Sequence, residues 1–369
     1  QYGSYNYQHN WQTKGTQQYT SNRFNISANM GHSDGWNSGK ASTETFFPNQ
    51  EHTFGVKDAY RYKHNLKPQL EAKLFAYTDS ANTIDVKVKA SYEKARKSYE
   101  EKSASYGYQP DQFAYHSLKE ALDAKPGDAL YDRLITRNRN YESTDLQQRG
   151  LNISYIWKHF IGKKGSFALQ GFTNLSGTNE DTHTNRDVEY LREQRNETLW
   201  QFYDRSAHEL ETQLGASFDY WLGKKVYFNV YDNVRLSRTR IARDFFSDTD
   251  EQNVANGTPT TADPANTTRR LTHKWTNELT VKSTITPVKA LMIMPKFKWN
   301  YSREKTDYHY GPLDTTAVRT SNTYEPSIFL KWKMSRVRNM DIAFAYNTTV
   351  PDLVSTLGYR NTIDPLHIY

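Results

Sequence analysis

Hydrophobic and polar residues alternate along many segments of this chain. In the stretch 289–301, KALMIMPKFKWNY, the side chains of Leu291, Ile293 and Phe297 share one face of an extended strand, with Pro295 interrupting the series. The same alternation recurs in segments 84–89, 151–155, 226–231, 327–333 and 341–346. An apolar face opposite a polar one, repeated over segments long enough to cross a bilayer, is typical of an antiparallel transmembrane β-barrel.

The alternation and the turn signals between segments predict about twelve strands in an all-β fold. We expect them at residues 4–13, 21–33, 60–78, 83–98, 147–160, 166–177, 206–221, 225–245, 268–285, 290–304, 319–335 and 339–349. The apolar side of these strands is expected to face lipid, and it includes Val226, Phe228, Val230, Leu291, Ile293, Ile328, Leu330, Ile342 and Phe344.

The turn signals differ in length from one connection to the next. Short turns are predicted near residues 78–83, 161–166, 222–225, 286–289 and 335–339. Long polar connections are predicted near residues 95–147, 176–205, 246–268 and 303–319. Outer-membrane barrels have short periplasmic turns and longer extracellular loops, so we expect one barrel domain over residues 1–369 with four long extracellular loops.

Composition agrees with a barrel better than with a soluble core. Apolar residues make up 36% of the 369 residues and the mean hydropathy is −0.90, yet aromatic residues reach 14%. No run of about 18 apolar residues exists, so a membrane-spanning helix is not predicted. The chain has no cysteine, which excludes disulfides and thiolate metal sites, and its net charge of +7 is small for this length.

Three segments resemble one family, the TonB-dependent-receptor-like outer-membrane β-barrels of Bacteroidota. Segment 70–92, LEAKLFAYTDSANTIDVKVKASY, resembles that family's strand, Asp-Ser turn and strand. Segment 155–169, YIWKHFIGKKGSFAL, resembles its Gly-containing hairpin, although Ser166 stands where Arg is common. Segment 347–369, NTTVPDLVSTLGYRNTIDPLHIY, resembles the stretch that precedes a Gly-Asn-Pro motif in the family.

The resemblance implies features that this chain does not itself display. It implies that a plug precedes Gln1 and that further strands follow Tyr369, completing a barrel of roughly 22 strands. It also implies that TonB acts through the plug. Accordingly, we expect this chain not to close a barrel by itself, with the strands at 4–13 and 339–349 as edges.

Candidates for metal binding and catalysis are weak. The histidines show no helical H-x-x-x-H spacing, so no metal site is predicted. Asp248, Asp250 and Gln252 resemble the start of a calcium loop, but the sixth position is Asn253 and Pro259 stands where the last ligand belongs. No nucleophile elbow and no phosphate-binding glycine loop occurs. We therefore expect neither an enzyme nor a cofactor.

Basic and aromatic side chains are the candidates for ligand binding. Strand alternation places Arg235 and Arg243 on the lumen face together with Tyr227 and Tyr231, and Arg238 and Arg240 on the opposite face. These arginines could attract an anionic ligand, although solvated strand ends balanced by nearby aspartates are the simpler interpretation. Tyr308 and Tyr310, in a predicted loop, are further candidates.

These observations lead to an outer-membrane receptor or transporter barrel for TonB-dependent-type uptake of an extracellular substrate. One alternative is a non-transport scaffold barrel that binds surface lipoproteins or secretion partners, and another is a secreted all-β binding protein. The expected partners are outer-membrane lipid and lipopolysaccharide, a surface lipoprotein, and TonB through the plug. No nucleic acid is expected. The expected location is the bacterial outer membrane.

Overall fold

The computed structural model describes residues 2–17, 22–45, 51–334, 338–351 and 353. Twelve strands form a single antiparallel sheet in the order β1 to β8, then β11 to β14. Their bounds are β1 Tyr2–Gln17, β2 Asn22–Thr45, β3 His52–Tyr77, β4 Asn82–Tyr108, β5 Leu134–Ile161, β6 Gly165–Tyr190, β7 Arg195–Leu222, β8 Val226–Asp248, β11 Thr268–Val288, β12 Leu291–Tyr310, β13 Leu313–Lys333 and β14 Asn339–Ala345. The predicted antiparallel all-β architecture is confirmed.

Short helical and strand segments decorate the connections. They are the helix α1 Leu118–Asp123, the 3₁₀ turns Pro110–Gln112, Tyr131–Arg133 and Glu251–Asn253, and the small hairpin of β9 Val254–Ala255 and β10 Thr258–Pro259. No helix in the described part of the chain is long and apolar enough to cross a membrane.

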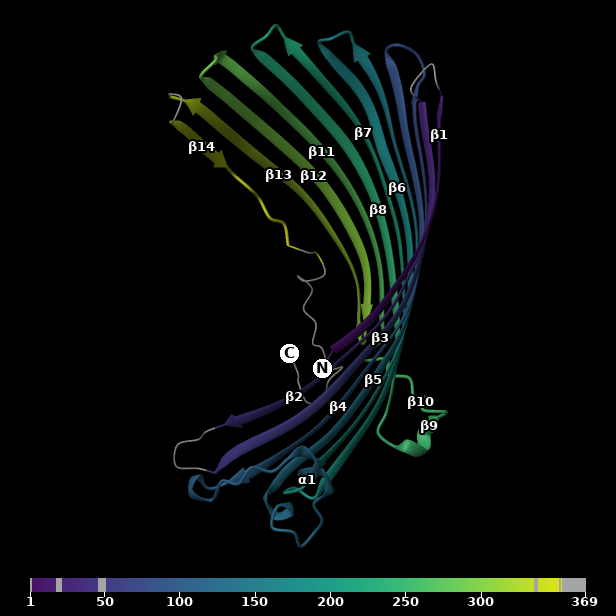
Figure 1. Ribbon diagram of the computed structural model, residues 1–369, viewed down its shortest axis with the longest axis vertical. Coiled ribbons are helices and arrows are strands. Elements are labelled where there is room, and N and C mark those ends of the chain that lie inside the picture. Colours follow the sequence, from purple (N-terminus) through teal and green to yellow (C-terminus); the bar gives the residue numbers. More distant parts are fainter. Residues whose placement is uncertain (1, 18–21, 46–50, 335–337, 352, 354–369) are drawn as a thin grey trace.

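The sheet is strongly curved and open (Figure 1). Among the described residues, β1 pairs only with β2 and β14 only with β13, so these strands are the two edges. Every other strand pairs with the strands beside it in antiparallel register. The predicted edge strands are therefore confirmed, while a total of roughly 22 strands stays a prediction.

Register places the apolar side chains on one face of the sheet. Phe228 lies opposite Tyr220 of β7, and Val230 lies opposite Phe218 of β7 and Val281 of β11. Residues directly opposite each other on neighbouring strands project from the same face, so the apolar face can be followed from strand to strand through these pairs. All nine residues predicted to face lipid lie on it.

The apolar residues form a belt that runs across the sheet from β2 to β14. Large members of this belt expose 37–63% of their surface: Phe24, Ile26, Leu70, Leu74, Tyr155, Leu169, Leu175, Leu210, Leu214, Phe218, Phe228, Leu236, Trp275, Val281, Phe297, Tyr324, Ile328, Trp332, Ile342 and Phe344. Exposed apolar patches of this extent do not persist in water, and a belt on one face of a sheet is how barrels meet lipid. The sheet is therefore of the outer-membrane barrel type, and the face with the belt is called the belt face.

Two rims bound the sheet, and Figure 1 shows them at its top and bottom. The turns at 78–81, 162–164, 223–225 and 289–290 lie at one rim, here called the turn rim, at the top. The opposite, distal rim carries α1 and the β9–β10 hairpin, at the bottom of the view. The predicted clustering of short turns at one rim is confirmed.

The predicted long loops are mostly strand, which corrects their extents. The β4–β5 connection spans 109–133 and the β8–β11 connection 249–267, while β6–β7 and β12–β13 turn within 191–194 and 311–312. Beyond the belt both faces of a strand meet water, so apolar alternation stops although the ladder continues. The sequence of a strand in this region is therefore as polar as that of a loop.

The β4–β5 connection packs onto the belt face near the distal rim. Tyr106 and Leu134 are each 1% exposed and belong to a small core with Phe54, Val56, Ala104, Tyr108, Ala121 and Ala124. Helix α1 begins with a capping box, in which the Ser117 side chain accepts from Glu120 and the Glu120 side chain accepts from Ser117. This connection is therefore a folded cap.

Asp248 anchors the β8–β11 connection. Its carboxylate accepts hydrogen bonds from the backbone N–H of Thr260 at 2.9 Å and of Thr261 at 3.3 Å, and from the Thr261 hydroxyl. The hydrogen bond from the Thr261 side chain, together with those from the backbone, holds the pKa of Asp248 below its usual value. Asp248 and Gln252 are therefore not arranged as the start of a calcium loop, because Asp248 is committed to the backbone.

Candidate functional site

The second face of the sheet is polar and concave. Register places Tyr227, Tyr231, Arg235 and Arg243 of β8 on this polar face, as predicted, and Arg238 and Arg240 on the belt face. The segment 346–351 after β14 descends into the hollow of the sheet in Figure 1. Thr348, Val350 and Pro351 from that segment line a cavity together with polar-face side chains.

Arg235 is the centre of a hydrogen-bonded cluster on the polar face. Its Nε and Nη2 donate to Oε1 of Gln213 at 3.2 and 2.9 Å, and its Nη1 lies 3.1 Å from Glu211. Nε2 of Gln213 in turn donates to the hydroxyl of Tyr231 at 2.8 Å. The guanidinium also lies 5.8 Å from the ring centroid of Phe172. Cross-strand neighbours on β6 and β7 therefore hold Arg235 in one orientation.

The cavity around Arg235 has a volume of about 620 Å³ and carries both signs of charge. Its walls include three cationic side chains, Arg235, Lys274 and Arg319, and three acidic ones, Glu278, Glu304 and Glu325. Arg319 lies 3.2 Å from Glu304, and Lys298 lies 3.1 Å from Glu278. This balance fits a polar ligand that offers both donors and acceptors better than a purely anionic one.

Arg243 belongs to a different part of the polar face. Its guanidinium lies 4.6 Å from the ring centroid of Tyr203, which lines a second cavity of about 960 Å³. The hydroxyl of Tyr203 donates to Glu180 at 3.1 Å, and Arg205 donates to the same carboxylate at 3.0 Å. Arg235 and Arg243 are roughly 27 Å apart along the strand at about 3.4 Å per residue, so they do not form one site.

Beside this second cavity, a cation–π contact and a half-buried ion pair join neighbouring strands of the polar face. Arg61 lies over the ring of Tyr99 at 5.0 Å, and Glu101 pairs with Lys57. Burial alone would raise the pKa of Glu101, but hydrogen bonds from Lys57 and Tyr99 outweigh it and hold that pKa below its usual value. Glu101 therefore stays ionised and fixes Lys57 and Tyr99.

Tyr308 and Tyr310 are not available as loop-borne ligand contacts. Both lie in β12, their rings stack at 6.4 Å, and they are 6% and 8% exposed. The hydroxyl of Tyr310 donates to Oδ1 of Asn266 at 3.3 Å, in the β8–β11 connection. The predicted loop position is wrong for these residues, because both belong to β12 and the β8–β11 connection contacts Tyr310. Ligand contact by them stays a prediction.

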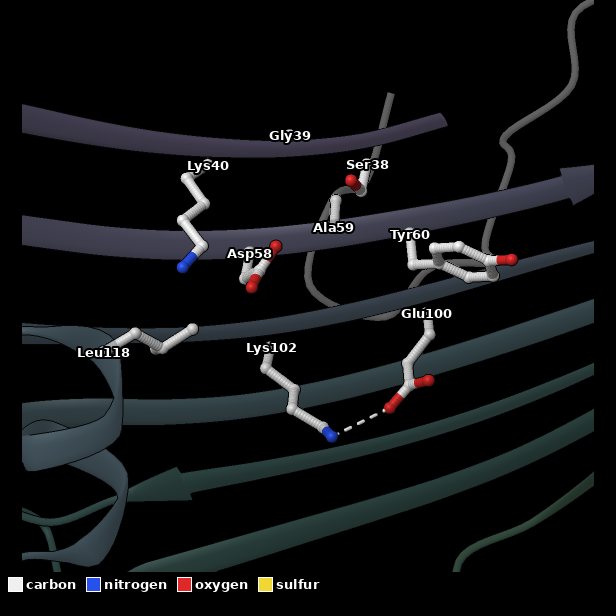
Figure 2. Close-up of a pocket in the computed structure, with 9 residues that line it drawn as sticks. All are labelled: Ser38, Gly39, Lys40, Asp58, Ala59, Tyr60, Glu100, Lys102 and Leu118. Atoms are coloured by element: carbon white, nitrogen blue, oxygen red, sulfur yellow. Dashed lines mark ion pairs between the residues drawn. The ribbon is translucent and has the colours of Figure 1, made fainter. Parts of the chain in front are cut away.

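A cavity on the belt face, beyond the belt, is a weaker candidate. Figure 2 shows its charged side chains Lys40, Asp58, Glu100 and Lys102, with Leu118 of α1 at its margin. Lys102 lies 2.9 Å from Glu100, and the two side chains are 47% and 48% exposed. Exposed ion pairs of this kind contribute roughly 0–1 kcal/mol and select ligands poorly. We assign no function to this cavity.

Four aspartates occupy one row across the distal half of the belt face. Asp145, Asp181, Asp204 and Asp244 lie directly opposite one another on β5, β6, β7 and β8. Arg96 pairs with Asp145 at 2.8 Å, and Arg269 pairs with Asp244. Burial raises the pKa of Asp181, and the charges of Asp204 and Asp145 raise it further. The middle of the row therefore carries like-charge repulsion.

Removing one charge from this row should stabilise the sheet. We expect Asp181→Asn to raise the free energy of unfolding by about 0.2–1 kcal/mol at pH 7, because like charges directly opposite each other are unfavourable. The gain should shrink as the pH falls through the raised pKa of Asp181, since the wild type then takes up a proton in the folded state. Urea unfolding of both proteins in detergent, at pH 7 and at a pH below the pKa of Asp181, measures the difference in free energy. Asp145→Asn, which removes the partner of Arg96, should give no gain, and an equal gain would contradict the explanation.

Three further side chains meet on the belt face of β2 and β3, where no site was predicted. Nδ1 of His64 lies 2.6 Å from Oδ1 of Asp34, and Nε2 of His32 lies 3.3 Å from Oδ2 of Asp34. The two ring nitrogens are 3.4 Å apart. His64 and Asp34 are directly opposite in the β2–β3 register. The sequence separation of about thirty residues hid this cluster, since only the register brings it together.

Comparison with known proteins adds the following findings. No family model matches the chain, and no curated protein sequence matches it. The chain is similar to the unliganded ferric citrate transporter FecA, with 11% identity, 90% of this chain and 43% of that chain covered, and a TM-score of 0.40. It therefore spans less than half the length of that transporter.

Two other solved structures are also similar. The outer membrane protease OmpT from Escherichia coli is 8% identical, with 84% of this chain and 96% of that chain covered and a TM-score of 0.25. The RagAB peptide importer in its closed-closed state is 8% identical, with 92% and 61% covered and a TM-score of 0.23. Every one of these TM-scores is below 0.5.

Proposed function

We propose that this chain is the barrel of a bacterial outer-membrane receptor that takes up a polar solute in a TonB-dependent manner. The observation that carries the proposal is the cavity around Arg235 on the concave polar face, opposite a continuous apolar belt. One face of the sheet suits lipid, and the other offers fixed donors and acceptors to a solute. The motifs that resemble the TonB-dependent-receptor-like barrels of Bacteroidota support energy coupling through a plug. No catalysed reaction is part of the proposal.

The charge pattern of the cavity supports a solute with both donors and acceptors. Arg235 is held by Glu211 and Gln213, so it can present its remaining surface to a ligand without reordering. Preorganised charged donors contribute more to binding than flexible ones, because their ordering cost is already met. Arg235 and Tyr231 are the contacts proposed here. Arg243 and Tyr227 stay predictions.

Uptake can be tested before the solute is identified. Wild-type cells and cells lacking the gene are given one defined mixture of short peptides, oligosaccharides and ferric chelates, and depletion is followed by mass spectrometry. We expect one solute class to remain in the medium of the deletion cells and of wild-type cells whose proton-motive force is dissipated. Equal depletion in all cultures, together with loss of a surface lipoprotein from the deletion cells, would favour the scaffold alternative.

Arg235 gives a residue-level prediction. Arg235→Ala should lower the uptake rate of that solute class by roughly 10–100-fold at low concentration, since hydrogen bonds to charged groups contribute about 1.5–3 kcal/mol. Arg238→Ala is the matched control, because Arg238 lies on the same strand but on the belt face. Uptake is measured at equal surface abundance of the protein. Equal loss in both variants would contradict the role of the polar face.

A further inference from the structure

The cluster of His32, Asp34 and His64 lies immediately beyond the apolar belt, on the outward face of the sheet. His32 and Asp34 are alternate residues of β2, and His64 reaches them from β3. The side chains are 34%, 26% and 41% exposed, so solvent and ions can reach them. One ligand atom from each residue lies within 4.8 Å of the others.

The separations of these atoms match the edges of a metal coordination shell. Zinc–nitrogen and zinc–oxygen distances of about 2.0–2.2 Å in a tetrahedral shell place neighbouring ligand atoms roughly 3.3–3.5 Å apart. Two of the three separations fit: the ring nitrogens are 3.4 Å apart, and Nε2 of His32 is 3.3 Å from Oδ2 of Asp34. The third, from Nδ1 of His64 to Oδ1 of Asp34 at 2.6 Å, is a hydrogen-bond distance, so an ion would replace the proton between these atoms and move them apart. A hydrogen-bonded Asp34–His64 pair alone would not require Nε2 of His32 to converge on the same point.

The carboxylate of Asp34 faces the two imidazoles, and the nearby arginine does not pair with it. Arg96, directly opposite His64 on β4, donates instead to Asp145 at 2.8 and 3.1 Å. The hydroxyl of Tyr62 donates to Oδ1 of Asp34 at 3.0 Å. Hydrogen bonds of this kind to a ligating carboxylate orient it and tune the affinity of a metal site.

We propose that His32, Asp34 and His64 form a binding site for a divalent transition-metal ion. Two imidazole nitrogens and one carboxylate oxygen suit Zn²⁺, Ni²⁺ or Cu²⁺, whereas Ca²⁺ and Mg²⁺ prefer shells made of oxygen. The three protein ligands leave a further coordination position for water or another donor. Because two strands contribute ligands, the ion joins β2 to β3 near the β1 edge. The site lies on the belt face, so it is independent of the proposed uptake function.

Metal binding to the full chain, purified in detergent, tests the proposal. Titration with Zn²⁺ alone, against a chromophoric zinc chelator, should show one high-affinity equivalent per chain. Substitution with Co²⁺ should give visible absorption bands of a site with nitrogen and oxygen ligands. Absence of a stoichiometric high-affinity equivalent, or weak binding of many ions per chain, would overturn the proposal.

Four variants assign the ion to this cluster. His32→Ala, His64→Ala and Asp34→Asn should each weaken Zn²⁺ binding by roughly 100-fold or more, since even neighbours that only orient ligands change affinity by about 10–100-fold. Tyr62→Phe keeps all three ligands and should weaken binding by roughly tenfold. His208→Ala, which removes a belt-face histidine on β7, is the control and should bind as the wild type does.

Circular dichroism confirms that each variant keeps its strands. A fold defect would also alter the spectrum without metal, so the binding result is interpreted for variants with unchanged spectra. Because Asp34→Asn preserves shape, it separates loss of the ligand from loss of packing. Zn²⁺ affinity that is unchanged in folded Asp34→Asn and His64→Ala would place the ion elsewhere and refute the assignment.

Discussion

Val230→Arg should lower the free energy of unfolding by about 2–4 kcal/mol, because it places a charge near the middle of the lipid-facing belt. On β8 the belt runs from Val226 to Leu236, so Val230 is close to its centre. Phe228→Arg, nearer the turn rim, should cost less, since the penalty falls toward the interfaces. Urea unfolding of the protein in liposomes measures both values.

Asn229 provides the matched control for the belt. It lies between Phe228 and Val230 in sequence, but its side chain projects from the polar face. Asn229→Arg should therefore change the free energy of unfolding by well under 1 kcal/mol. If Asn229→Arg is as costly as Val230→Arg, the penalty is not specific to the belt face and the membrane interpretation is wrong.

Tyr106→Ala should release the cap formed by residues 109–133. The ring is 1% exposed, its hydroxyl donates to the carbonyl of Ala114 at 3.3 Å, and it accepts from the backbone N–H of His116 at 3.1 Å. Truncating a buried aromatic ring costs about 3–5 kcal/mol, which raises the open population of the cap roughly 100-fold or more. Trypsin cleavage after Lys119, timed by mass spectrometry, reports this population.

Two variants separate packing from hydrogen bonding in the cap. Tyr106→Phe keeps the ring and should raise the cleavage rate by roughly tenfold or less, because a hydrogen bond contributes about 1 kcal/mol. Tyr115→Ala removes a side chain on the same connection that is 63% exposed, so it should change the rate little. Equal cleavage rates in the wild type and all three variants would mean that the cap is already open.

The sequence predicted the strands well where one face meets lipid. Around Val226 and Leu291 the period of two is strong, because lipid and water impose opposite requirements on neighbouring residues. The prediction failed beyond the belt, as in β6 from Ser176 to Tyr190, where both faces are wet. Backbone hydrogen bonds between strands maintain the ladder there. These bonds do not depend on the type of side chain, so the sequence shows no pattern from which the strand could be predicted.

The candidate sites show a similar division. The faces of Arg235 and Arg243 follow from alternation within one strand, so the sequence was sufficient for them. The partners of Arg235 and the contact between His32 and His64 depend on cross-strand register, which a single sequence does not reveal. Burial of Tyr310 depends on how a connection folds over the sheet, and no local pattern encodes that fold.

The strands continue far past the belt, and with the distal rim outside the cell, as the loop lengths predict, this length determines what a phage or an antibody can reach. From Leu175 to Tyr190, β6 extends about 50 Å along its axis at roughly 3.4 Å per residue. The hairpin tip at 191–194 is therefore carried on a stiff, hydrogen-bonded stalk. A binding protein that contacts this end would meet fixed ladders of side chains, and an epitope inserted at that tip would lie far from the belt.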